Sequence, residues 1–169
     1  MIRRSKAAIG AAVLLAGLTF AITPPTSAAS VSGPHRFINY VGTGDCLDAG
    51  ALYGDPNDVY SVRCNSFSDP YLSHQQWFIV TTATPGLYLI KHSATGKCLY
   101  MSGGGKNGVY LSSCSEKVVN QRWKIENNHI RNAAYGYLLY DEAGTTDIRG
   151  AANPNPYNNS YWKQTAPGQ

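Results

Sequence analysis

The 169-residue sequence predicts an all-β domain built from three similar units. Three observations lead to this fold class. Each of the three tryptophans closes a related phrase, "HQQWFIV", "NQRWKIE" or "NSYWKQT". A glycine-containing phrase recurs upstream of each: "FINYVGTGDCLD" (37–48), "LIKHSATGKCLY" (89–100) and "HIRNAAYGYLLY" (129–140). Short runs such as "GLYLIKH" are rich in β-branched and aromatic residues and are bounded by turn formers, which is typical of strands.

The N-terminal segment is predicted to be a secretory signal peptide. Arg3, Arg4 and Lys6 precede the apolar run "AAIGAAVLLAGLTFAI", and small residues follow it, so cleavage after Ala29 is expected. A membrane anchor is the alternative, but the run is shorter than the roughly 20 residues of a spanning helix. We therefore expect residues 1–29 to be removed and 30–34 to form a short lead. The mature protein is expected to be extracellular and free of the membrane.

The charge of the mature chain argues against nucleic acid as a partner. Of the 14 Lys and Arg residues, three lie in the signal segment, which leaves 11 against 10 Asp and Glu. A net charge of +1 provides no basic surface for nucleic acid or for anionic lipid. No partner of either kind is expected.

The three units can be aligned on Gly44, Gly96 and Gly136. Ile38, Ile90 and Ile130 precede these glycines by six residues, and Cys-Leu or Leu-Leu follows them. Downstream, "NDVYSVRC" (57–64), "NGVYLSSC" (107–114) and "TDIRGAAN" (146–153) correspond. The units span about 35–82, 86–126 and 127–165. Four short strands in each of three units predict a β-trefoil over 35–166, because a propeller usually needs about four to eight blades.

Four cysteines are expected to form two disulfides, since these bonds persist in exported proteins. Three pairings are possible, and the similar separations of 18 and 16 residues favour Cys46–Cys64 and Cys98–Cys114. The third unit lacks both cysteines, at Leu138 and Asn153, as a bridge within each unit predicts. Because close Cys or His pairs are missing, no metal site and no cofactor are expected.

The combination of Cys-Leu-Asp, Val-x-x-x-x-Cys and Gln-x-Trp in three units resembles the ricin B-type lectin family. The resemblance covers about residues 35–166 and implies a β-trefoil that binds carbohydrate. We predict that Trp77, Trp123 and Trp162 lie in the core. The glutamine of the same phrase is predicted to satisfy local backbone groups.

The resemblance also implies sugar contacts from an Asp after Cys-Leu, an aromatic residue two before the second cysteine, and an Asn before Gln-x-Trp. No unit holds the full set, so the sites are predicted to be degenerate. Asp141 lies one residue past the family position, and one step along a strand reverses the side chain. The corresponding positions are Asp48, Val62 and His74 in the first unit, Tyr100, Ser112 and Asn120 in the second, and Tyr140, Ala151 and Asn159 in the third.

Two tyrosines offer a substitute for the missing aromatic residue. Tyr60 and Tyr110 lie two residues before the stacking positions, so on a regular strand they share the same face. A phenol supplies both a ring and a hydroxyl. The predicted carbohydrate-binding residues are Asp48, Asn57, Tyr60, His74 and Gln75 in the first unit, and Tyr100, Tyr110 and Asn120, more weakly, in the second. The alternative is that these tyrosines pack at the surface and bind nothing.

Two functions remain to be compared. We expect a non-catalytic, monomeric carbohydrate-binding protein, since no carboxylate pair, paired-histidine motif or nucleophile elbow suggests catalysis. The alternative is a protein-binding trefoil such as a protease inhibitor, because a fold does not determine a function. Loops 50–58 and 64–75 would then make the contact, with Tyr53, Phe67 and Tyr71 as exposed aromatic residues.

Overall fold

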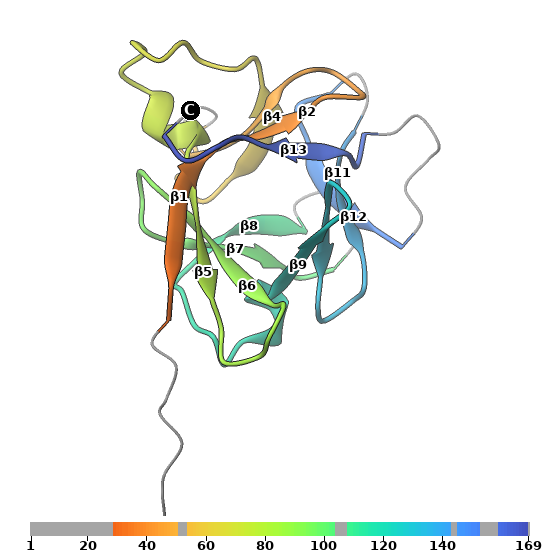
Figure 1. Cartoon of the computed structure of the whole chain (residues 1–169). Helices are drawn as coiled ribbons and strands as arrows, with labels where there is room; N and C mark the ends of the chain where they lie inside the picture. Colours follow the sequence, from red (N-terminus) through yellow and green to blue (C-terminus); the bar gives the residue numbers. More distant parts are fainter. Residues whose placement is uncertain (1–28, 51–53, 104–107, 143–144, 153–158, 169) are drawn as a thin grey trace, which may run out of the picture.

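The protein is a β-trefoil, as predicted, in which three four-stranded units surround one core (Figure 1). The computed structural model describes residues 29–50, 54–103, 108–142, 145–152 and 159–168. The first unit contains β2 (Phe37–Asn39), β3 (Cys46–Ala49), β4 (Val59–Val62) and β5 (Trp77–Thr81). The second contains β6 (Tyr88–His92), β7 (Cys98–Met101), β8 (Val109–Ser112) and β9 (Trp123–Glu126). The third contains β10 (His129–Asn132), β11 (Leu138–Asp141), β12 (Ile148–Ala151) and β13 (Trp162–Gln164).

Three short elements lie outside this pattern of four strands. Strand β1 (Val31–His35) precedes the first unit and pairs with β5, so the predicted lead is largely a strand. The 3₁₀ helices η2 (Leu72–Gln75) and η3 (Val119–Gln121) each end two residues before the tryptophan of their unit. None of the described helices is long and apolar enough to cross a membrane.

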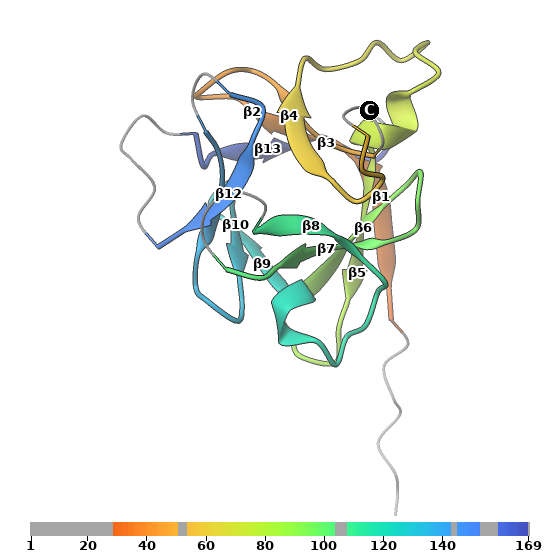
Figure 2. The ribbon, with the colours of Figure 1, turned by 180° about the vertical axis from the view of Figure 1, so that it is seen from behind.

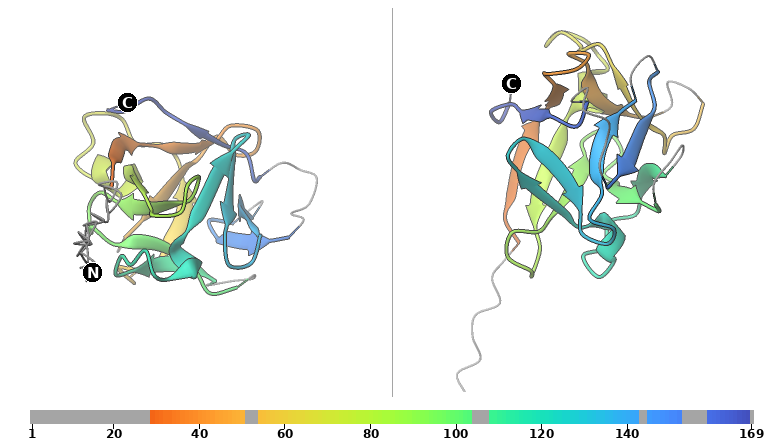
Figure 3. Two further views of the ribbon diagram at one scale, coloured as in Figure 1. Left: turned by 60° about the horizontal axis from the view of Figure 1, so that its bottom comes forward. Right: turned by 90° about the vertical axis from the view of Figure 1, so that its right-hand side faces the viewer.

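The strands form two antiparallel sheets that continue from one unit into the next. One sheet follows the order β1-β5-β6-β9-β10-β11-β12, with β7 paired to β6 and β8 paired to β7, and the other follows β13-β2-β3-β4. The first and last strands of the trefoil are therefore neighbours, and β13 runs beside β2 in Figure 1. Other views show the hairpins of all three units around a common centre (Figure 3).

Backbone hydrogen bonds also join the loop before β4 to β8, and the loop before β12 to β4. Leu111 N on β8 donates to Asn57 O of the first unit at 2.8 Å. Ser61 N on β4 donates to Thr146 O of the third unit at 3.0 Å. Strands β4, β8 and β12 contact one another, as the view from behind shows (Figure 2). The surfaces between units are thus fixed by main-chain bonds.

The three tryptophans lie in the core, as predicted, and hold equivalent places. Each is buried, and each indole Nε1 donates to the backbone carbonyl oxygen of a leucine on the second strand of its own unit. The pairs are Trp77–Leu47 at 3.0 Å, Trp123–Leu99 at 3.0 Å and Trp162–Leu139 at 2.9 Å. A buried indole needs a partner for its N–H, and the fold supplies the same one three times.

The glutamines of the first two units bond to the backbone, as predicted. Gln75 Oε1 accepts from Asn65 N at 2.7 Å, and its Nε2 donates to Arg63 O at 3.0 Å. Gln121 makes the same pair of bonds, to Ser115 N and to Ser113 O. In both units the amide thereby fixes the backbone on either side of the second cysteine.

The alignment of the first unit was wrong by one residue. Asn39, His92 and Asn132 hold one place, because the carbonyl oxygen of each accepts from the N–H of Gly44, Gly96 or Gly136. That glycine follows five residues after Asn39 but four after the other two, so the first turn contains an extra residue. The buried counterpart of Ile90 and Ile130 is therefore Phe37, while Ile38 is only half-buried.

Both predicted disulfides are present. Cys46–Cys64 and Cys98–Cys114 each have a Cα–Cα distance of 4.9 Å. In the third unit Leu138 occupies the place of the first cysteine and pairs with Ala151 on β12. The place of the second cysteine, Asn153, lies outside the described residues.

Candidate functional site

The first unit contains a pocket of about 370 Å³ that includes three predicted site residues, Asp48, Tyr60 and His74. Strands β3 and β4 form its floor, and the 64–75 loop with helix η2 forms its wall. The complete lining is Asp48, Tyr60, Val62, Asn65, Asp69, Tyr71 and His74. Tyr60 and Val62 line the same pocket, as expected for residues two apart on a strand.

Asp48 provides a carboxylate at the base of this pocket. It lies opposite Tyr60 in the β3–β4 register, and both residues are 4% exposed. Burial raises the pKa of Asp48, while hydrogen bonds from Gln75 and Tyr60 and the nearby charge of His74 oppose the rise. Its Oδ1 accepts no hydrogen bond within the described part of the chain. A buried acceptor of this kind gains from a ligand hydroxyl.

His74 is held in the pocket wall by its neighbours. A Cβ on Gly50 would lie 2.9 Å from His74 Nδ1, and Gly50 has a φ of +130°, so only glycine suits this contact. The ring centroids of Tyr71 and His92 lie 5.6 Å and 6.1 Å from that of His74. The imidazole therefore has a fixed place beside the carboxylate.

His92, from the second unit, supports the backbone of His74. His92 Nε2 lies 2.9 Å from His74 O, and His92 Nδ1 lies 3.0 Å from Thr95 Oγ1. Burial lowers the pKa of His92 to about 4, although the bond to His74 raises it. In the neutral ring Nε2–H donates to the carbonyl, and Nδ1 accepts from the threonine hydroxyl. Asn132 Nδ2 and Asn39 Nδ2 make the equivalent bonds, to Asn120 O at 2.8 Å and Asn159 O at 3.0 Å.

The exposed ring of the pocket comes from Tyr71, not from Tyr60. Tyr71 is 64% exposed and stands edge-on to His74, whereas Tyr60 is buried. Phe67, in the same loop, is also exposed, and the Arg36 guanidinium lies 4.4 Å from its ring centroid. Loop 64–75 thus presents two of the three aromatic side chains that the sequence suggested as contact residues, and the third, Tyr53, lies outside the described residues.

Two predicted residues of the first unit do not line this pocket. Asn57 lies in a different pocket, where its Oδ1 accepts from Lys97 Nζ. Gln75 is fully buried, and its role is to bond the backbone and to support Asp48. Asn65 and Asp69 line the pocket but were not predicted. The unusual length of the first unit was the only sequence signal for them.

In the second unit the predicted residues lie together but contact one another. Tyr100 and Tyr110 hold the places of Asp48 and Tyr60, and their ring centroids are 4.8 Å apart. Burial raises the pKa of Tyr110, and its interaction with Tyr100 adds to the rise. Asn120 Nδ2 donates to Met101 O at 2.8 Å and to Tyr135 Oη at 3.3 Å. Side chains therefore occupy the space that is open in the first unit.

The third unit has a different set of groups at this place. Tyr140 pairs with Arg149, which forms ion pairs with Glu142 and with Asp147. Asp141 points to the opposite face, as predicted, and is 0% exposed. It accepts from Thr43 Oγ1 at 2.9 Å. Burial raises the pKa of Asp141, and Asp45 adds to this, while hydrogen bonds from Thr43 and Asn39 oppose it.

Comparison with known proteins supports this description. Residues 73–154 match the family described as "Ricin-type beta-trefoil lectin domain-like". This matched region spans β5 to β12 and includes the tyrosine pair of the second unit. A comparison with curated protein sequences found no match.

Solved structures share the fold at low sequence identity. The Polyporus squamosus lectin, bound to Neu5Aca2-6Galb1-4GlcNAc, has a TM-score of 0.64 and 15% identity, over 80% of this chain and 49% of that one. The Haemophilus ducreyi cytolethal distending toxin has a TM-score of 0.61 and 14% identity, over 80% and 85%. The designed threefold-symmetric protein ThreeFoil has a TM-score of 0.59 and 19% identity, over 78% and 96%. The chain thus spans about half the length of the lectin that it matches.

Proposed function

We propose that this protein is a secreted, non-catalytic carbohydrate-binding protein, because residues 73–154 match the ricin-type β-trefoil lectin-like family. The pocket of the first unit is the proposed binding site. The observation that carries the proposal is the meeting of a buried carboxylate, Asp48, with an exposed ring, Tyr71, in one pocket of about 370 Å³.

These groups match the two surfaces of a pyranose. The apolar face of the sugar packs on the Tyr71 ring, whose edge contact with His74 fixes its direction. A sugar hydroxyl donates to Asp48, and the amide of Asn65 and the carboxylate of Asp69 lie at the same pocket for further hydroxyls. Charge-assisted bonds of this type are the stronger ones.

The proposal includes a single site of this type on the trefoil. In the second unit two tyrosines with their rings in contact hold the corresponding places, and in the third Arg149 is engaged with two carboxylates. Without several identical sites the protein lacks the avidity that linked weak sites provide. Binding to a single sugar is therefore expected to be weak.

The test is glycan-array binding by the 30–169 chain and three variants. Asp48→Asn removes the charge with little change of shape and should weaken binding roughly tenfold or more, since hydrogen bonds to charged groups contribute about 1.5–3 kcal/mol. Tyr71→Ala removes the ring and should have a similar effect. Tyr140→Phe, at the equivalent place of the third unit, is the control and should bind like the parent.

Full binding by both Asp48→Asn and Tyr71→Ala would contradict the proposed site. A silent array together with inhibition of secreted proteases would instead favour the protein-binding alternative. Secretion is tested separately, by comparing the culture medium of cells that express the full chain with that of cells expressing residues 30–169.

A further inference from the structure

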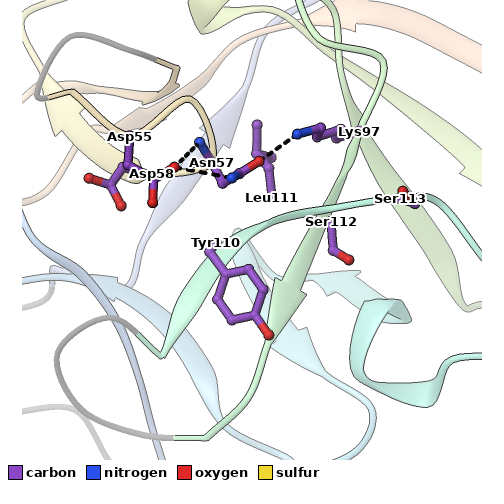
Figure 4. Close-up of a pocket in the computed structure, with 8 residues that line it drawn as sticks. All are labelled: Asp55, Asn57, Asp58, Lys97, Tyr110, Leu111, Ser112 and Ser113. Atoms are coloured by element: carbon purple, nitrogen blue, oxygen red, sulfur yellow. Dashed lines mark hydrogen bonds between the residues drawn. The ribbon is translucent and has the colours of Figure 1, made fainter.

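A second and larger pocket lies where the first and second units meet. Its volume is about 540 Å³. One wall is the loop before β4, and the other is β8 with the residue that precedes β7 (Figure 4). The lining residues are Asp55, Asn57, Asp58, Lys97, Tyr110, Leu111, Ser112 and Ser113.

The two walls are fixed to each other by the backbone. Asp58 forms a β-bridge with Tyr110, and Leu111 N donates to Asn57 O at 2.8 Å. Asp55 Oδ1 accepts from both nitrogens of Asn57, at 2.8 Å and 3.1 Å, and Asn57 Oδ1 accepts from Lys97 Nζ. Figure 4 shows this chain of bonds from Asp55 to Lys97. These hydrogen bonds therefore hold the polar side chains of the pocket in place.

Several groups in this pocket still have hydrogen-bonding capacity. Among the described residues, no side chain donates to the Asp58 carboxylate, and the hydroxyls of Ser112 and Ser113 make no hydrogen bond. Burial raises the pKa of Asp58, and the charges of Asp55 and Asp147 add to the rise. Donors from a ligand would stabilise this carboxylate.

The lining carries charges of both signs. Asp55 and Asp58 stand on the wall of the first unit, and Lys97 stands on that of the second. Neither a carboxylate nor an amine on a ligand matches the whole lining, because each is attracted by one of these charges and repelled by the other. A neutral molecule with adjacent hydroxyls suits both, because each hydroxyl is both donor and acceptor.

We propose that this inter-unit pocket binds a neutral saccharide. One hydroxyl donates to Asp58, a neighbouring hydroxyl accepts from Lys97, and further hydroxyls pair with Ser112 and Ser113. The apolar face of the sugar meets the Tyr110 side chain. The site extends the proposed carbohydrate function, on which its ligand class rests, but it takes its acceptor and its cation from two different units.

The test follows amide chemical shifts of the ¹⁵N-labelled 30–169 chain during titration with neutral methyl glycosides of galactose, glucose and mannose. Saturable shifts at Asp58, Lys97, Ser112 and Ser113 are expected with at least one of them. Asp58→Asn should weaken that titration roughly tenfold, the effect of losing one charge-assisted bond. Glu116→Gln, in the exposed turn after Cys114, is the matched control and should leave the titration unchanged.

The outcomes separate this site from the first one. Shifts confined to Asn65, Tyr71 and His74 would support the proposed function and overturn the inter-unit site. Shifts confined to the inter-unit residues would do the reverse. The inference is also overturned if Asp58→Asn titrates like the parent, if glucuronate or glucosamine shifts the same amides as strongly as the neutral glycosides, or if none of the glycosides shifts them.

Discussion

The first two units of the trefoil share a framework but differ in what occupies the same place on it. Each has a buried tryptophan bonded to a leucine carbonyl, a glutamine bonded to the backbone, and one disulfide. Yet Asp48 and Tyr60 leave a pocket in the first unit, while the rings of Tyr100 and Tyr110 contact each other in the second. The framework and the surface side chains thus vary independently.

Loop length adds to the difference between the units. Trp77 follows Cys64 by 13 residues, whereas Trp123 follows Cys114 by 9. The longer loop carries Asn65, Asp69 and Tyr71, which supply the wall of the first pocket. A unit of this fold therefore needs both a short acidic side chain on its strand and a long loop to form such a pocket.

The largest expected effects test what the two units share. Trp77→Ala and Trp123→Ala should each lower the free energy of unfolding by about 3–5 kcal/mol, because each leaves a large cavity and an unpaired carbonyl. Urea denaturation measures both. Equivalent partners predict similar costs, so a loss below about 1 kcal/mol for either variant would contradict the equivalence of the units.

Removing the disulfides provides the next comparison. The bridge that Cys46→Ser/Cys64→Ser removes closes a loop of 18 residues in the parent, and the bridge that Cys98→Ser/Cys114→Ser removes closes one of 16. Each pair should lose about 3 kcal/mol, with a difference of roughly 0.1 kcal/mol between them. Urea denaturation under non-reducing conditions is the measurement. A much greater loss from one pair would show that the two bridges do not have equivalent roles.

A pH effect should distinguish the second unit from the others, because it alone has a histidine where the other units have Asn39 and Asn132. The folded pKa of His92 is about 4, below the 6.5 of an unperturbed histidine. The unfolded chain then binds more protons between these values, so His92 stabilises the protein fully above pH 6.5. That contribution, up to roughly 3 kcal/mol, is lost as the pH falls towards 4.

His92→Asn isolates this effect, since asparagine makes the equivalent bond in the other two units. Unfolding free energies of the parent and the variant, measured from pH 7 to 4, should differ progressively as the parent loses stability. The raised pKa values of Asp48 and Asp141 act in the opposite direction in both proteins and cancel in the difference. Parallel curves would contradict the assignment.

The smallest expected effect comes from giving the second unit the acidic residue of the first. Tyr100→Asp removes the ring contact with Tyr110, at a cost of about 0.5–1.5 kcal/mol, and places a carboxylate at the position that corresponds to Asp48. New but weak amide shifts near Asn120 on titration with methyl glycosides are expected. Tyr100→Phe keeps the ring and should show none. Identical titrations for the two variants would mean that the acidic residue does not determine the difference.

The architecture could be predicted because each unit repeats a structural requirement. Trp77, Trp123 and Trp162 mark equivalent buried places, and the paired absence of cysteines at 138 and 153 indicated a bridge within each unit. The one error in alignment arose because the glycines were used as markers. The turn before Gly44 has one residue more than the turns before Gly96 and Gly136. The strand pairing shows this extra residue, whereas the six-residue spacing from Ile38 to Gly44, which matches the other units, hides it.

The site was only partly predictable, because it depends on contacts between distant residues. Asp48, Tyr60 and His74 came from strand positions, and the structure brings them together. Tyr71 replaces Tyr60 as the exposed ring because the β3–β4 hairpin and its neighbours bury Tyr60. The contact between Asn57 and Lys97 joins residues 40 apart in different units, and no local pattern indicates it.

Because β13 pairs with β2, the third unit is joined to the first as each unit is joined to the next, and the chain could start at another unit without changing the fold. Thr165 N donates to Arg36 O and Gly168 N to Pro34 O, both at 2.9 Å, so the two ends of the domain meet. A short peptide could join them, and the exposed turn at 83–86, between β5 and β6, could then receive the new termini. Such a circular permutant would begin at the second unit, retain both disulfide loops, and keep the pocket of the first unit near its new C-terminus.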